Sequence, residues 1–338
     1  MSLDAFLIIG AQRSGTSLLT RMLNQHAELA VPPESFFFNV FVPLANYYGD
    51  LEQDENLVRF VDDVLSTPKV SEWSPTPTRD EVLVRLEART QGAVFQALLD
   101  TWAASQGKTM WGEKTPHHVF FWDEIEKTFP DVPLVHIVRD GRDVALGLVR
   151  ARFGPKSIHA AATRWAHWMA RIEMIRARVG AGRIHEARYE DLLAEPQRTL
   201  AGICEFLDVP FDPEMLEFHR DTSLYSRYAA DHANLKRPLL TDKIAAWRHT
   251  MRSSDVALFE SVASEGLRRH GYPVETDAVP LSPLRRAYYR FLHHPPRKAL
   301  GLLRNRAGHH EEFRLFRMRA RLLLRYWLRR PRQAPSPR

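Results

Sequence analysis

The sequence predicts an α/β fold: a mostly parallel sheet flanked by helices, with helical insertions and a basic, helical C-terminal tail. Three observations predict it. Short apolar segments alternate with segments of helical periodicity, as a parallel sheet with crossover helices requires. The first apolar segment, residues 5–9, leads through a glycine-containing loop into a helix. Another, residues 134–138, lies between Pro133 and the turn at Asp140-Gly141, so it has the bounds of a buried strand.

The remaining elements continue this alternation. Strands are expected at residues 5–9, 109–112, 134–138 and 183–187. Helices are expected at residues 16–25, 34–48, 52–66, 79–104, 116–128, 157–179, 197–207 and 254–270. The segment 34–48 is an aromatic-rich insertion whose rings either fill the core or face a cleft. We therefore expect one α/β domain over residues 1–275 and a basic extension over residues 276–338.

Composition bounds the class of protein. The chain has 338 residues, of which 44% are hydrophobic and 26% charged, as expected of a globular protein with a sizeable core. A single cysteine, Cys204, excludes an intramolecular disulfide and a cysteine-rich metal site. The dispersed histidines show no zinc spacing, so no metal is expected. Neither a signal peptide nor a spanning helix is predicted, so we expect a cytoplasmic protein.

The net charge of +6 is unevenly distributed. Residues 281–338 hold 16 Lys/Arg against 2 Asp/Glu, which leaves an acidic excess in the preceding 280 residues. In the tail, one face of a predicted helix is apolar and a neighbouring face is basic: Phe313, Phe316, Ala320, Leu323 and Trp327 on the first, Arg314, Arg317, Arg321 and Arg325 on the second. Such a helix could lie on an anionic membrane surface, here the inner face of the membrane. Alternatively, it packs its apolar stripe on the body or on a partner subunit. Nucleic-acid binding is not expected, because no recognised module accompanies the charge.

The loop Gly10-Ala11-Gln12-Arg13-Ser14-Gly15-Thr16-Ser17 is the strongest motif in the chain. Two glycines five residues apart, after a strand and before a helix, let backbone N–H groups approach a phosphate closely. The loop is therefore of the kind found in P-loop nucleotide-binding proteins. Thr16 stands where the triphosphatases have lysine, and a basic residue appears earlier, at Arg13. The alternative is an ordinary strand-to-helix turn.

With this loop, the sequence resembles the sulfotransferases that use 3'-phosphoadenosine 5'-phosphosulfate, in the branch that includes tyrosylprotein, carbohydrate and many bacterial enzymes. The resemblance covers about residues 5–272 and includes a segment from Lys243 to Arg248. It rests on five segments in order, the loop among them: Gly10–Ser17, Pro33-Glu34-Ser35, Gly112-Glu113-Lys114-Thr115-Pro116, Val138-Arg139-Asp140-Gly141-Arg142-Asp143-Val144 and Arg188-Tyr189-Glu190-Asp191-Leu192. It implies the fold predicted above and in-line transfer of a sulfuryl group to a hydroxyl, or less readily an amine.

The resemblance also implies how the donor is bound. Backbone N–H groups around Ser14, Gly15, Thr16 and Ser17 would hold the 5'-phosphosulfate. Arg13 and Lys114 would stabilise the negative charge that develops on the leaving phosphate. Because two side-chain cations supply this stabilisation, no metal is required.

Recognition of the 3'-phosphate is assigned to Arg139, since a guanidinium binds phosphate through two hydrogen bonds. The family usually has a serine eight residues later, where this chain has Gly147. We expect a backbone N–H there, or Arg142, to take over that contact. Tyr189 completes the expected cofactor-binding set. The alternative for Arg139 and Arg142 is surface pairing with Asp140 and Asp143.

Transfer to a hydroxyl requires a base to take its proton. The resemblance assigns this role to Glu34; His117 and His118 are the alternative bases. Glu113 would be either a structural ion pair or a second acidic contact. The acceptor would be a carbohydrate, lipid, peptide or small molecule. Two other functions remain open: a phosphoryl-transfer kinase on the same loop, and a nucleotide-binding or membrane-docking protein whose catalytic set has decayed.

Overall fold

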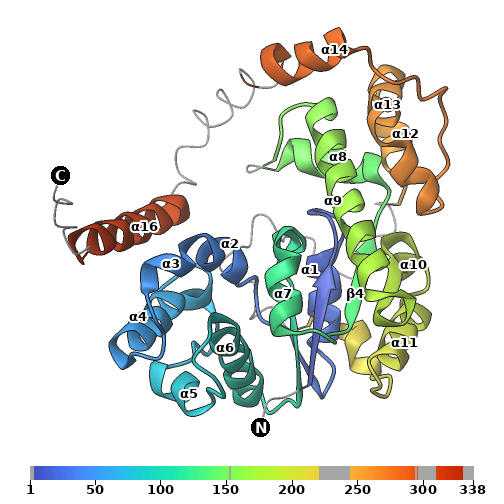
Figure 1. Ribbon diagram of the computed structural model, residues 1–338. Coiled ribbons are helices and arrows are strands. Elements are labelled where there is room, and N and C mark those ends of the chain that lie inside the picture. Colours follow the sequence, from blue (N-terminus) through green and yellow to red (C-terminus); the bar gives the residue numbers. More distant parts are fainter. Residues whose placement is uncertain (1–3, 152–153, 221–243, 294, 296–309, 330–338) are drawn as a thin grey trace, which may run out of the picture.

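The fold is built on a five-stranded, fully parallel sheet (Figure 1). The computed structural model describes residues 4–151, 154–220, 244–293, 295 and 310–329. The strand order is β2-β3-β1-β4-β5, so β1 lies at the centre. The strands are β1 Asp4–Ile9, β2 Leu29–Ala30, β3 Met110–Glu113, β4 Leu134–Val138 and β5 Ile184–Arg188. The predicted fold class is confirmed, and the four predicted strands agree with the structure within one residue at each end.

Both faces of the sheet are buried at its centre, which explains why β1 and β4 are almost continuously apolar. Leu7 and Ile9 of β1 contribute to one core cluster, whereas the alternating Phe6 and Ile8 contribute to the other. All five residues of β4 are buried, including His136. The register places Asp4 opposite Met110 and Leu7 opposite Leu134.

Helices cover both faces. One core cluster packs under α1 (Thr16–Leu23), α10 (Tyr189–Ala194) and α11 (Pro196–Phe206). The other packs under α6 (Gln91–Ser105), α7 (Trp122–Thr128), α8 (Gly141–Arg150), α9 (Ile158–Val179) and α13 (Ser253–Arg269). The other helical segments before residue 270 are α4 Asp54–Leu65 and nine shorter ones: α2 Phe37–Phe41, η1 Val42–Leu44, α3 Ala45–Tyr48, η2 Val70–Glu72, α5 Arg79–Val84, η3 Pro116–Phe121, η4 Ala181–Arg183, η5 Pro213–Glu217 and α12 Trp247–Thr250.

Several elements differ from expectation. Neither β2 nor α10 was predicted, and the helix expected over residues 34–48 is divided into α2, η1 and α3. The helix expected over residues 79–104 is two helices, α5 and α6, because Thr78 and Thr90 each cap a separate N-terminus. The helix expected over 116–128 begins as the 3-10 segment η3 before α7. The helix α8 was expected only as a turn; it begins directly after Asp140, whose side chain accepts a hydrogen bond from the Arg142 N–H.

The aromatic insertion packs mainly inward. Phe37, Phe41 and Tyr48 are buried and surround Phe60 of α4. Together with α5 and α6, these segments form a helical lobe beside the β2 end of the sheet (Figure 1). The alternative of core packing therefore holds for these three rings, whereas Phe36 is only partly buried.

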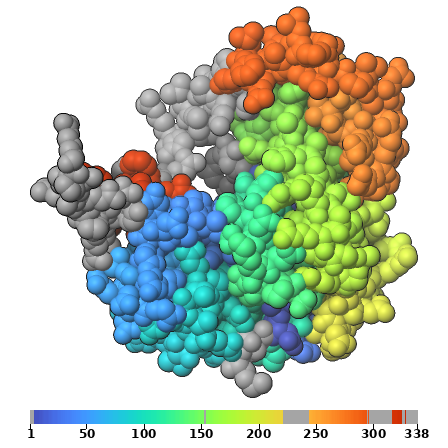
Figure 2. Space-filling view, viewed as in Figure 1, coloured from blue at the N-terminus to red at the C-terminus, as the bar shows by residue number. Residues whose placement is uncertain are grey.

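The C-terminal segment contributes α14 (Pro283–Ala287), a π-helical turn η9 (Tyr288–His293) and α16 (His310–Arg329). In Figure 2 the orange residues that include α14 form the top edge of the molecule. The α16 helix lies against α3, with Leu322 buried and Met318 partly buried. The predicted apolar stripe faces away from the body: Phe316 is 65% exposed and Trp327 70%. Within the described residues, no helix is both long and apolar enough to cross a membrane.

Candidate active site

The candidate residues follow the carboxyl ends of the strands. Because all five strands are parallel, these ends meet along one edge of the sheet, where open α/β folds bind ligands. The glycine loop follows β1, Glu34 follows β2, Lys114 follows β3, Arg139 follows β4 and Tyr189 follows β5. Segments far apart in the sequence are thereby brought into one place.

The loop after β1 needs its glycines for two different reasons. At Gly15 the backbone has φ of +97°, and a Cβ would lie 2.3 Å from Cδ2 of Tyr189. At Gly10 a Cβ would lie 2.6 Å from the carbonyl oxygen of Ile137 in β4. The Ser14 N–H donates to the Ala11 carbonyl at 3.1 Å, which closes the turn. Arg13, also with positive φ, carries its side chain to the surface.

Lys114, Glu34 and Ser17 come together beside this loop. The Lys114 Nζ lies 2.5 Å from Oε1 of Glu34 and 3.4 Å from Oγ of Ser17. The Lys114 side chain is 1% exposed, whereas that of Glu34 is 28% exposed. The buried ammonium is therefore neutralised by a carboxylate that solvent, or an acceptor, can still reach.

A second carboxylate, Glu113, is hydrogen-bonded to residues next to Glu34 and Lys114. It accepts hydrogen bonds from Ser35 Oγ at 2.8 Å, Thr115 Oγ1 at 2.6 Å and His118 Nδ1 at 2.8 Å. Burial raises the pKa of Glu113, but His118 and these hydrogen bonds outweigh it and lower the pKa below its ordinary value. Glu113 thus joins the residue after Glu34 to the residue after Lys114. Its ion-pair partner is His118, which is 3% exposed and poorly placed to meet an acceptor.

The other candidate histidine, His117, stays close to Glu34. Its ring lies 6.0 Å from that of Phe36 and 5.2 Å from that of Trp168. Burial lowers the pKa of His117; the Glu34 carboxylate raises it, and Arg164 lowers it further. His117 is therefore a half-buried neighbour of Glu34 whose charged form is disfavoured by burial.

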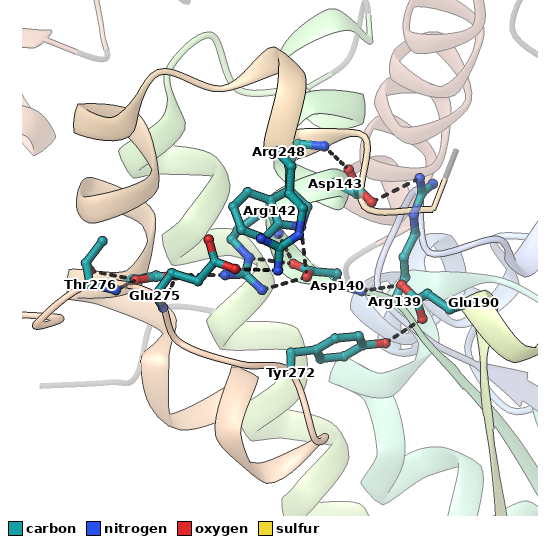
Figure 3. Close-up of polar contacts among 11 residues, drawn as sticks. Arg139, Asp140, Arg142, Asp143, Glu190, Arg248, Tyr272, Glu275 and Thr276 are labelled. Carbon is teal, nitrogen blue, oxygen red and sulfur yellow. Dashed lines mark hydrogen bonds and ion pairs between the residues drawn. The ribbon is translucent and has the colours of Figure 1, made fainter. Parts of the chain in front are cut away.

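Arg139 lies between the loop and β5. Its guanidinium stacks over the Tyr189 ring at 4.2 Å, and Nη1 donates to the Arg13 carbonyl at 3.4 Å. Its expected partner Asp143 is 3.8 Å away, the long contact drawn in Figure 3. Burial raises the pKa of Asp143, and Arg139 lowers it. Arg139, Tyr189 and the loop are thus neighbours, as the cofactor-binding assignment requires.

Arg142 is not where the sequence suggested. Its side chain is fully buried, bonded to Asp140 through Nε at 2.9 Å and Nη2 at 2.7 Å, and to Glu260 through Nη1 at 2.7 Å (Figure 3). It also stacks on Trp247 at 3.7 Å. Burial lowers the pKa of Arg142, but the two carboxylates raise it above its ordinary value. The alternative of pairing with Asp140 is therefore observed, but the pair is buried and not at the surface. A guanidinium held by two carboxylates in this way is not available to replace the missing serine.

Gly147, on α8, lies against the loop instead. A Cβ at this position would be 3.3 Å from Cβ of Arg13 and 3.5 Å from its Nε. That contact is tight, so the absence of a side chain at Gly147 leaves room for the Arg13 stem. This packing was not predicted, because α8 itself was not predicted.

Two further residues of the region were given no role from the sequence: Trp247, which was noted only as part of a resembling segment, and Arg164, which was not noted at all. Trp247 donates from its backbone N–H to Asp143 at 2.8 Å and from Nε1 to Asp140 at 3.1 Å. Arg164 of α9 donates to Oε1 of Gln12 in the loop at 3.5 Å. Lys243, part of the same resembling segment as Trp247, lies outside the described residues. Across the part of the chain that the structure describes, no three His, Cys, Asp or Glu residues are grouped to hold a metal.

Comparison with known proteins gives a single family. Residues 5–213, more than half of the chain, match the model described as the sulfotransferase family. The sulfotransferase domain of the curacin biosynthetic pathway is 20% identical, with a TM-score of 0.56 over 81% of this chain and 100% of that domain. The sulfotransferase domain of the Synechococcus PCC 7002 olefin synthase is 21% identical, with a TM-score of 0.52 over 77% of this chain and 94% of that one. These two likenesses support the fold.

Curated relatives match over shorter stretches. Protein-tyrosine sulfotransferase A of Caenorhabditis elegans is 27% identical over 158 residues, 44% of this chain and 41% of that protein. An uncharacterised protein of Aquifex aeolicus is 24% identical over 221 residues, 63% of this chain and 26% of that protein. The chain thus spans well under half the length of both curated relatives.

Proposed function

Because the chain belongs to the sulfotransferase family, we propose that it transfers a sulfuryl group from 3'-phosphoadenosine 5'-phosphosulfate to a hydroxyl-bearing acceptor. The observation that carries this proposal is the contact of Lys114 Nζ with Glu34 Oε1 at 2.5 Å and with Ser17 Oγ at 3.4 Å. It sets a cation and a base beside a phosphate-binding loop. A kinase on the same loop is less well supported, since Thr16 stands where its lysine would be.

The donor would lie along the edge of the sheet. Backbone N–H groups of Ser14, Gly15, Thr16 and Ser17 would hold its 5'-phosphosulfate at the N-terminus of α1. Arg139, already beside Tyr189 and the loop, would bind the 3'-phosphate. Gly147 would contribute through its backbone and by leaving room for Arg13.

During the transfer, the acceptor hydroxyl loses its proton and the leaving phosphate gains negative charge. The acceptor oxygen attacks sulfur in line as its proton passes to Glu34, and the bond from sulfur to the bridging phosphate oxygen breaks. Negative charge then moves to the leaving phosphate, where Lys114 and Arg13 stabilise it. In the free protein Lys114 and Glu34 neutralise one another; the donor draws Lys114 toward its phosphosulfate, which leaves Glu34 available as the base.

A labelled-donor assay tests this function. Protein is incubated with donor carrying a labelled sulfuryl group and a panel of phenols, sugars, hydroxylated lipids and tyrosine peptides, and labelled product is counted. We expect transfer to at least one class, and loss of transfer in Lys114→Met. The exposed Lys127 of α7 provides the matched control, Lys127→Met, which should remain active. Transfer of labelled phosphate from ATP, or full activity of Lys114→Met, would contradict the proposal.

We also propose that residues 1–275 form the sulfotransferase domain and that the basic extension, residues 276–338, attaches it to an anionic membrane surface. On α16, Phe316, Leu324 and Trp327 are 65%, 58% and 70% exposed, and Arg317, Arg319 and Arg321 are exposed on the same helix. Apolar side chains that enter the lipid interface, flanked by arginines that meet anionic headgroups, are typical of interfacial helices. The side chains of Phe313, Arg314 and Arg325 lie outside the described residues.

A further inference from the structure

Arg164 stands at the end of a row of side chains on α9. Trp168 and Arg171, four and seven residues further on, lie on the same face of the helix. Trp168 Nε1 donates to the Pro116 carbonyl at 3.0 Å, and Arg171 Nε donates to the Val119 carbonyl at 3.0 Å. This face of α9 therefore runs along η3, the segment that follows Lys114. Arg164, one turn before Trp168, extends the row beyond η3 to the glycine loop.

At that position Arg164 has little to bind. It is half-buried, and its hydrogen bond to Gln12 Oε1 is long at 3.5 Å. Among the described residues, no carboxylate forms an ion pair with it. Arg142 and Arg176, by contrast, are each paired with two carboxylates. Burial lowers the pKa of Arg164, and Arg164 is near enough to lower the pKa of His117.

A guanidinium that is withdrawn from water without a counter-charge is unfavourable in the free protein. An anionic ligand would offset that cost, and partly buried cations of this kind mark binding sites. The expected donor contacts are the loop, Lys114 and Arg139, at the ends of β1, β3 and β4. Arg164 approaches from α9 and faces Gln12 and His117, and His117 is the neighbour of the base Glu34.

We propose that Arg164 binds an anionic group of the acceptor, so that the favoured acceptor carries a carboxylate, phosphate or sulfate near the hydroxyl that receives the sulfuryl group. This inference rests on the proposed function. Selectivity follows because a neutral acceptor would cover Arg164 without supplying a counter-charge.

Paired acceptors that differ only in charge test the proposal. We would use 4-hydroxyphenylacetate against its amide for phenols, and glucuronate against glucuronamide for sugars. Wild type should favour the acid in each pair that it turns over. Arg164→Gln should lower kcat/KM for the acid by roughly ten- to hundred-fold, the worth of one charged hydrogen-bonded contact, and leave the amide nearly unchanged. Arg164→Lys should restore part of the loss, and Arg171→Gln should keep the preference for the acid.

A binding measurement tests the same proposal without requiring turnover. The same acids and amides are titrated calorimetrically into protein saturated with 3'-phosphoadenosine 5'-phosphate, which occupies the donor site. The wild type should bind the acid more tightly, and Arg164→Gln should lose that preference. Equal affinity for acid and amide in the wild type, or an equal loss for both in Arg164→Gln, overturns the proposal; the equal loss would mean that Arg164 contacts a part that the acid and the amide share. Failure of the nucleotide to bind would instead overturn the proposed function.

Discussion

The Glu34 carboxylate and the Lys114 ammonium lie 2.5 Å apart, so their opposite charges offset one another in the free protein. Both were identified from the sequence, from segments 80 residues apart. Their direct contact was not predicted, because it depends on β2 and β3 being neighbours in the sheet. β2 has only two residues and leaves no periodic pattern to detect.

Glu34→Gln should lower kcat by about 10²- to 10⁴-fold, because the amide keeps the shape of the side chain but cannot take the acceptor proton. Affinity for 3'-phosphoadenosine 5'-phosphate, measured by calorimetry, should remain close to wild type. Glu52→Gln, at an exposed position, serves as the control. Full activity of Glu34→Gln would move the base to His117.

The imidazole of His117 should titrate below the usual histidine pKa of about 6.5, since burial disfavours its charged form. Two variants should move this pKa in opposite directions. Arg164→Gln removes a neighbouring positive charge and should raise it; Glu34→Gln removes a negative charge and should lower it. The ring-proton chemical shift followed against pH by NMR measures both. Shifts of the same sign, or none, would contradict the placement of His117 between these residues.

Arg142 shows the limit of local reasoning at this scale. Its pairing with Asp140 was foreseen from adjacency, yet its burial was not. Glu260 is 118 residues away and Trp247 more than a hundred, and these two residues close the pocket around its guanidinium. Arg164 was overlooked for a similar reason: on a helix of 22 residues, one arginine is distinguished only by what other elements leave unpaired.

Among the elements, the strands were the most predictable, because burial on both faces leaves a run of apolar residues that few other structures share. The predicted helix bounds were wrong where a capping residue starts a new helix within an apparently continuous helical pattern, as Thr78 and Thr90 do. The α8 helix was not predicted because Asp140-Gly141 is as typical of a turn as of a capped helix N-terminus. That omission matters, since α8 carries Gly147 to the loop.

The loop between β1 and α1 gives an element-scale prediction. Gly15→Ala should lower the unfolding free energy by about 1–3 kcal/mol, because the φ of +97° is unfavourable for alanine, and the new methyl group would displace the Tyr189 ring. Nucleotide affinity should fall with it. Gly182→Ala, at a glycine with no other atom within 4 Å of its Cβ position, is the control. Thermal unfolding and calorimetry measure both effects. Wild-type values for both in Gly15→Ala would refute this account of the loop.

For the whole molecule, the charge distribution along the sequence predicts an acidic body and a basic extension, but it does not show which side of the tail helix meets the body. The apolar stripe was recognised by its spacing. Met318 and Leu322 contact the core, whereas Phe316 and Trp327 are exposed. Helical periodicity places residues on a face; only the tertiary contacts decide which face is covered.

Liposome flotation tests the membrane proposal on the full chain. Wild type should float with phosphatidylserine-containing vesicles and less with pure phosphatidylcholine, because each arginine near the surface contributes about 1 kcal/mol only when anionic lipid is present. Combining Phe316→Glu with Trp327→Glu should abolish flotation. Val84→Glu, at a valine of α5 that is 87% exposed, should not. Equal flotation of wild type and the double variant would exclude α16 as the attachment site.

At the edge of the sheet, we propose that the Gly10–Ser17 loop, Lys114 and Arg139 together bind 3'-phosphoadenosine 5'-phosphosulfate. Calorimetric titration of the wild-type chain with 3'-phosphoadenosine 5'-phosphate and, separately, with ATP and magnesium tests it most directly. We expect tight, metal-independent binding of the 3'-phosphorylated nucleotide and much weaker binding of ATP. Tighter binding of ATP with magnesium, or no binding of either nucleotide, would contradict it.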